Sequence, residues 1–136
     1  MDKKGKIAHF LQAEHFAVAG ASTNRSKFGN KILRSYLEHG YKATPVNPVA
    51  AQVEGIPSVA SVAELPAEVT ALSIITPPQV TRKVVAEAIA QGHIKHIWMQ
   101  PGAEDKDAVE LCQAHGINTI ADGSCLLVEI GFSEGH

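Results

Sequence analysis

The stretch Phe16–Pro48, FAVAGASTNRSKFGNKILRSYLEHGYKATPVNP, contains the pattern that decides the fold. It opens with a short, uniformly apolar run at 16–21, which is typical of a strand buried on both faces. After a polar loop, apolar residues recur over 32–37 with the spacing of one helix face. Gly40 ends this helix, and a second strand follows at 43–46. The stretch therefore predicts a βαβ unit.

The loop between the first strand and the helix has the composition of an anion site. Gly20 allows a sharp turn and a close approach of a ligand to the backbone. The helix that follows presents unpaired N–H groups and the positive end of its dipole, while Arg25 and Lys27 add positive charge. The other hydrogen-bonding side chains of the loop are Ser22, Thr23, Asn24 and Ser26. We expect this loop to bind phosphate; the alternative is a solvated loop without a ligand.

The form of the loop disfavours a nicotinamide dinucleotide. The dinucleotide fingerprint needs G-x-G-x-x-G and an acidic residue about twenty positions further on. Here Gly20 is followed by Ala21 and Ser22, so the second glycine is missing. The next glycine is Gly29, and Asn47 stands where the acidic residue should be. The phosphate-binding Walker A sequence is also absent.

Strand and helix patterns alternate along the rest of the chain. The predicted strands are 16–21, 43–46, 70–75, 94–99 and 117–121. Helices are predicted at 4–12, 79–91 and 105–115 in addition to the helix of the βαβ unit. The segment 49–68 is predicted as a connection, in which Ser61 and Glu64 have the spacing of a capping box. Residues 125–130 form a last packed turn, and the tail 131–136 is expected to be loose.

This alternation predicts the α/β class: a Rossmann-like three-layer sandwich with a five-stranded parallel sheet and helices on both faces. Right-handed crossovers favour the strand order 3-2-1-4-5 in a single domain over 1–136. Ligands bind such sheets at the carboxyl ends of the strands, here at a switch point between the first and fourth strands. The strand ends expected to line that crevice are Gly20, Ala21, Ser22, Val46, Asn47, Pro48, Thr76, Pro77, Pro78, Gln100, Pro101 and Gly102.

Composition limits the class of protein. The 136 residues are 45% apolar and 19% charged, with a formal net charge of −2. No long basic run, apolar stretch of about 20 residues or signal-peptide pattern is present. Two cysteines, Cys112 and Cys125, lack the spacing of a metal site. We expect a cytoplasmic globular protein with neither a nucleic-acid nor a membrane partner.

The combined motifs resemble those of the small single-domain CoA-binding proteins. They are V-A-G-A-S at 18–22, H-G-Y at 39–41, P-V-N-P at 45–48, T-P-P at 76–78, I-W-M-Q-P-G at 97–102 and D-x-x-C at 122–125. The resemblance covers about 10–129. It extends to the N-terminal CoA-binding domains of the succinyl-CoA synthetase α-subunit and of ADP-forming acyl-CoA synthetases. It implies a Rossmann-like fold that binds coenzyme A.

The resemblance also implies roles for individual residues. Ser22, Arg25 and Lys27 would hold phosphates at the first turn, and 46–48 would flank the adenosine. The segments 76–78 and 100–102 would line the rest of the ligand. The synthetases carry a phosphorylated histidine in a second domain, which this sequence lacks, and its seven histidines do not match that active-site context. Gly123 and Ser124 replace a basic residue that usually follows the last strand.

Cys125 follows the fifth predicted strand, close to the expected crevice. A thiol there would be able to form a mixed disulfide with the CoA thiol, although a cysteine at such a position is also a common small apolar residue. Cys112 lies on the apolar face of a predicted helix and is expected to be in the core. Glu104, Asp105 and Asp107 open that helix, where the helix dipole favours acidic residues.

We find no Ser-His-Asp, metal-binding or paired-carboxylate arrangement in the sequence. The sequence therefore favours a protein that binds CoA or an acyl-CoA without evident catalytic machinery. It leaves open whether the protein is an enzyme. The alternative is an NAD(P)-binding redox sensor or an enzyme subunit that acts with a partner chain. A protein partner fits either reading, and the oligomeric state is not predicted.

Overall fold

A computed structural model of the chain describes residues 2–133, centred on a five-stranded parallel sheet of order β2-β1-β5-β6-β7. The strands are β1 (His15–Ala19), β2 (Lys42–Val46), β5 (Ala71–Ile74), β6 (His96–Met99) and β7 (Asn118–Ile120). The α-helices are α1 (Lys3–Leu11), α2 (Phe28–Glu38), α3 (Pro78–Gln91), α4 (Lys106–Ala114) and α5 (Leu126–Ile130). The predicted α/β, Rossmann-like class is confirmed. No helix within 2–133 is long and apolar enough to cross a membrane.

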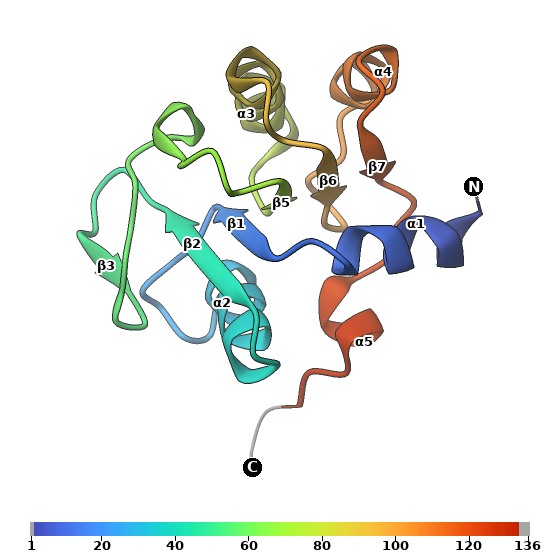
Figure 1. Cartoon of the computed structure of the whole chain (residues 1–136). Helices are drawn as coiled ribbons and strands as arrows, with labels where there is room; N and C mark the ends of the chain where they lie inside the picture. Colours follow the sequence, from blue (N-terminus) through green and yellow to red (C-terminus); the bar gives the residue numbers. More distant parts are fainter. Residues whose placement is uncertain (1, 134–136) are drawn as a thin grey trace.

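Successive residues of β1 face opposite sides of the sheet, as the strand period requires. Phe16 and Val18 pack in a core with residues of α1, α2 and α5. Ala17 and Ala19 pack in a second core with residues of α3 and α4. Figure 1 shows the corresponding layers, with α3 and α4 on one side of the sheet and α2 and α5 on the other. The expected three-layer sandwich with helices on both faces is therefore present.

The strand order needs one correction. The order 3-2-1-4-5 places the third predicted strand, 70–75, at the outer position beside the second strand, but β5 pairs with β1, with Ala19 opposite Ile74. The outer position of the 3-2-1-4-5 pattern is held by an isolated parallel bridge between Val46 and Val59. The pattern is kept if this bridge counts as a rudimentary third strand. A single bridge leaves no strand pattern in the sequence. Because β5 lies beside β1, the switch point lies between these two strands.

The segment predicted as a plain connection contains a small hairpin. Strands β3 (Gln52–Val53) and β4 (Ile56–Pro57) are antiparallel and are joined by Glu54 and Gly55. Both turn residues have positive φ, +52° and +79°, as a tight hairpin turn requires. A 3₁₀ turn, η1 (Val62–Glu64), follows without a side-chain cap. The predicted capping box is absent. In a capping box the Ser61 hydroxyl would accept from the Glu64 N–H, but here it donates to the Glu64 carboxylate at 3.5 Å.

A buried aromatic contact fixes α2 against the sheet. The Tyr36 ring stacks on Phe16 with 4.5 Å between ring centroids, and its hydroxyl lies 2.6 Å from the Ser73 hydroxyl. Burial raises the pKa of Tyr36 far above its ordinary value, so this hydroxyl stays neutral. The contact joins α2 to both β1 and β5. It therefore fixes the C-terminal end of α2 against the sheet.

Candidate functional site

The turn after β1 requires glycine at two positions. Gly20 has φ of +96°, and a Cβ there would lie 2.3 Å from the Ile75 carbonyl oxygen. Gly29, in the first turn of α2, lies against the same turn, because its Cβ would lie 1.9 Å from the Gly20 carbonyl oxygen. Gly29 therefore allows the close helix–strand packing that the last glycine of a dinucleotide fingerprint provides.

Hydrogen bonds within the loop shape the segment between these glycines. The Ser22 hydroxyl accepts from the Asn24 N–H at 3.0 Å. The Asn24 amide oxygen accepts from both the N–H and the hydroxyl of Ser26, at 3.0 and 2.7 Å. From α2, the Asn30 amide donates to the Ser22 carbonyl at 2.8 Å. Polar groups that we expected to face a ligand thus hold the loop in its conformation.

The two basic residues of the loop differ in their surroundings. The Arg25 guanidinium lies 3.6 Å from the Glu54 carboxylate, which also accepts from the Asn30 amide at 3.1 Å. Lys27 precedes α2, and its side chain makes no capping hydrogen bond. Glu54 is not among the predicted site residues, because the hairpin that carries it has no pattern in the sequence. Its carboxylate competes with any bound anion for Arg25.

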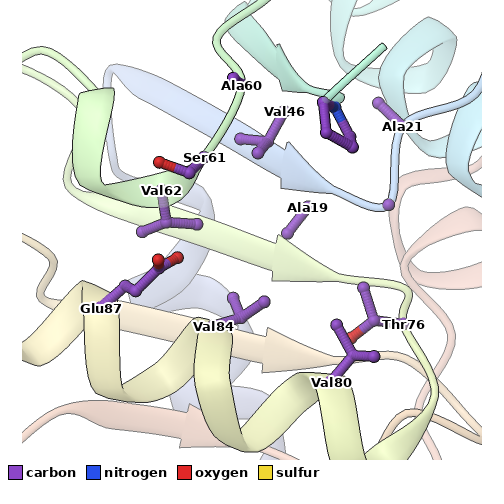
Figure 2. A pocket seen from close by; sticks show the side chains of 12 residues that line it. Ala19, Ala21, Val46, Ala60, Ser61, Val62, Thr76, Val80, Val84 and Glu87 are labelled. Atoms are coloured by element: carbon purple, nitrogen blue, oxygen red, sulfur yellow. The ribbon is translucent and has the colours of Figure 1, made fainter.

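A cavity of about 280 Å³ lies at the carboxyl ends of β1, β2 and β5, between the sheet and α3. We call it the α3-side cavity. Its lining residues are Ala19, Gly20, Ala21, Val46, Pro48, Ala60, Ser61, Val62, Thr76, Val80, Val84 and Glu87. Figure 2 shows Val80, Val84 and Glu87 on the α3 wall, with Val46, Ala60 and Ser61 across from them. The structure thus brings together Gly20, Ala21, Val46, Pro48 and Thr76 from the predicted set.

The lining residues at 60–62 and on α3 are not among the predicted site residues. Val80, Val84 and Glu87 recur at i, i+4 and i+7, so the helix period was a signal that Glu87 shares a face with apolar residues. Glu87 is half-buried there. The segment 60–62 gave no such signal, because tertiary contacts place it at the cavity: the bridge between Val46 and Val59, and the Gln91 amide, which donates to the Val62 carbonyl at 3.1 Å.

Asn47, predicted to flank a ligand, bonds to the protein itself. Its amide nitrogen donates to the Ala21 carbonyl at 3.0 Å, which joins the ends of β2 and β1. Its amide oxygen accepts from the N–H groups of Val49 and Ala50, both at 2.8 Å. The side chain therefore holds two strand ends together at the rim of the cavity.

Two more cavities continue along the same edge of the sheet. The Cys125-side cavity, of about 270 Å³, is lined by Phe28, Ile75, Gln100, Pro101 and Cys125. The bridging cavity, of about 260 Å³, is lined by Ile75, Thr76, Pro77, Pro101, Gly102 and Ala103. It shares Thr76 with the α3-side cavity and Ile75 and Pro101 with the Cys125-side cavity. Pro78 begins α3 and lines none of these three cavities.

The two cysteines have different surroundings. Cys125 is half-buried and lines the Cys125-side cavity. Cys112 is fully buried, and burial raises the pKa of its thiol to about 11. The core position predicted for Cys112 is confirmed. Within residues 2–133, no group of three or more His, Cys, Asp or Glu side chains is arranged to hold a metal ion.

A strand–loop–helix turn built on two closely packed glycines, with cavities on both sides of the switch point, is the arrangement of a Rossmann-like domain. The family described as "CoA binding domain" matches residues 14–131, and the chain belongs to this family.

The chain is similar to several known proteins, one of which is a subunit of a CoA ligase. The α-subunit of an ADP-forming acetate–CoA ligase II of Pyrococcus furiosus is 27% identical over 84% of this chain. The chain spans only 27% of that subunit. The uncharacterized protein YneT of Bacillus subtilis is 23% identical over 88% of both chains. The structure of a conserved hypothetical protein from Pyrococcus furiosus has a TM-score of 0.80 and 37% identity, over 85% of this chain and 98% of its own.

Proposed function

We propose that this protein binds coenzyme A, free or acylated, across the carboxyl edge of the sheet. The observation that carries the proposal is the row of three cavities over the switch point in a chain of the CoA binding domain family. The two outer cavities suit the two ends of an extended ligand, with the glycine turn between them for its phosphates.

The adenine ring is assigned to the α3-side cavity. Val46, Val80 and Val84 provide apolar walls for a flat ring, and the Glu87 carboxylate is an acceptor for its exocyclic amine. The diphosphate lies at the turn formed by Gly20 and Gly29, close to the N-terminus of α2. Arg25 and Lys27 supply its positive charge.

The remaining arm of the ligand crosses the bridging cavity and ends in the Cys125-side cavity. NAD(P) is the weaker candidate, because the residue that follows β2 is Asn47, whose amide bonds to the protein and carries no negative charge for a ribose diol. One relative is a ligase subunit, so we further propose that a second protein chain uses the bound CoA.

A thermal-shift panel of CoA, dephospho-CoA, acetyl-CoA, ADP, NAD and NADP tests the ligand. A ligand at 100 times its Kd stabilises the folded state by about 2.7 kcal/mol, which raises Tm by several degrees. We expect CoA or acetyl-CoA to raise Tm and NAD to leave it unchanged. A shift with NAD or NADP alone would replace CoA by a nicotinamide cofactor.

A further inference from the structure

The side chain of Gln100 contains a buried hydrogen-bond donor without a partner. Gln100 is 3% exposed, and its Nε2 bonds to no described residue. Its Oε1 accepts from the Leu126 N–H at 3.3 Å. This bond fixes the orientation of the amide, because exchanging oxygen and nitrogen would place two donors against each other. Buried polar groups are nearly always paired, so this donor requires an explanation.

The position of Gln100 indicates what its partner is. Gln100 lines the Cys125-side cavity, whose other walls include Phe28, Ile75 and Pro101. In a cavity with apolar walls, one amide donor selects a ligand that places an acceptor beside it. Nε2 has hydrogens to donate and no capacity to accept. The matching ligand group is therefore a neutral oxygen acceptor on an otherwise apolar arm.

We infer that Gln100 donates a hydrogen bond to a carbonyl oxygen of the ligand arm in the Cys125-side cavity. This inference rests on the proposed function. The arm of coenzyme A carries amide carbonyls, and an attached acyl group adds a thioester carbonyl. The shared chemistry is a carbonyl oxygen, and Gln100 is the residue that recognises it.

The test compares ligands with and without the arm. Binding of CoA, acetyl-CoA and adenosine 3′,5′-bisphosphate is measured by titration calorimetry for wild type and Gln100→Met, which has a similar volume and no donor. We expect Gln100→Met to weaken CoA or acetyl-CoA binding by about tenfold, the effect of one lost hydrogen bond. Affinity for the bisphosphate, which has no arm, should be unchanged. Gln113→Met, the same change at an exposed position of α4, should bind every ligand as wild type does.

The pattern of loss identifies the carbonyl. Weaker binding of acetyl-CoA alone would assign the donor to the thioester, and equal weakening of CoA and acetyl-CoA would assign it to an arm amide. Wild-type affinity of Gln100→Met for both would overturn the inference and leave a buried water as the partner of Nε2. Loss of bisphosphate binding would also overturn it, because the effect would not be confined to the arm.

A second variant covers a folding defect. Gln100→Leu, which likewise has no donor and adds no charge, is used, with the same expected loss, if Gln100→Met does not fold. If wild type itself binds none of the three ligands, the proposed function fails, which is distinct from failure of the inference about Gln100.

Discussion

Gly29 lies so close to Gly20 that a Cβ on Gly29 would come within 1.9 Å of the Gly20 carbonyl oxygen. This contact joins the first turn of α2 to the end of β1, and it sets the position of the loop between them. Gly29→Ala must therefore push the helix away from the strand.

We expect Gly29→Ala to lower the free energy of unfolding by about 1–3 kcal/mol, as overpacking does, and to weaken CoA binding. Urea denaturation and titration calorimetry measure the two effects. The control is Gly92→Ala at the end of α3, where φ is +81° and an added Cβ meets nothing within 4 Å. Its backbone strain costs about 1–2 kcal/mol and should leave affinity unchanged. Wild-type CoA affinity of Gly29→Ala would contradict the role of this packing.

Arg25 and Lys27 together are predicted to bind the phosphates. We expect Arg25→Ala combined with Lys27→Ala to weaken CoA binding at least about tenfold, because charge-assisted hydrogen bonds are lost. The loss should shrink at high salt, since salt screens exposed charges. The control pair, Lys42→Ala with Lys95→Ala, removes equal charge at the amino ends of β2 and β6. Unchanged affinity of the Arg25 and Lys27 variant would exclude the phosphate assignment.

Glu54 is predicted to restrain CoA binding through its ion pair with Arg25. Glu54→Gln removes the charge and keeps an oxygen acceptor for Asn30. Freeing an exposed guanidinium should strengthen CoA binding by up to about fivefold, since such pairs contribute at most about 1 kcal/mol. Glu110→Gln on α4 makes the same change of charge away from the site. The prediction fails if both variants show the same affinity in parallel titrations.

Asp105 is predicted to make stability depend on acid pH. Two hydrogen bonds from Arg82, both 2.9 Å, and one from the Ala108 N–H at 3.0 Å lower the pKa of Asp105 below its ordinary 3.8. Its stabilising contribution is therefore complete above the unfolded pKa and is lost as the pH falls below 3.8 through the folded pKa.

Asp105→Asn should be less stable than wild type at pH 7, with a difference that narrows below pH 3.8. Urea denaturation from pH 7 to pH 2.5 (about 0.5-unit steps) follows this difference. Asp107→Asn is the control, because its carboxylate is 71% exposed and lies 4.0 Å from Arg82. A constant difference between wild type and Asp105→Asn across the range would rule out this linkage.

Cys125 is predicted to form a disulfide with the CoA thiol under oxidation. Each thiol loses one hydrogen to diamide, which is reduced to the hydrazine, and the two sulfurs join. Mass spectrometry of intact protein should show the adduct with wild type and none with Cys125→Ser. That variant retains Cys112, which is fully buried, and so controls for reaction at the other cysteine. An adduct on Cys125→Ser would end the redox hypothesis.

The local elements of this protein could be predicted because each has a periodic signal. The apolar run at 16–21 and the helical spacing at 32–37 indicated β1 and α2, and both are present. The predicted crevice residues also gather at one sheet edge, because parallel strands place their carboxyl ends together. The hairpin that carries Glu54 and the bridge at Val59 were not predicted, because neither has a periodic pattern of apolar residues in the sequence.

The sequence by itself determined the α/β class, the glycine turn after β1 and the motifs of the CoA-binding family, since all three depend on neighbouring residues in the chain. Tertiary structure alone decided that β5 lies beside β1, that Glu54 reaches Arg25 and that the Nε2 of Gln100 has no partner among residues 2–133. These depend on contacts between segments far apart in sequence. Such contacts are set by how complete side chains pack, and packing leaves no periodic mark on the chain.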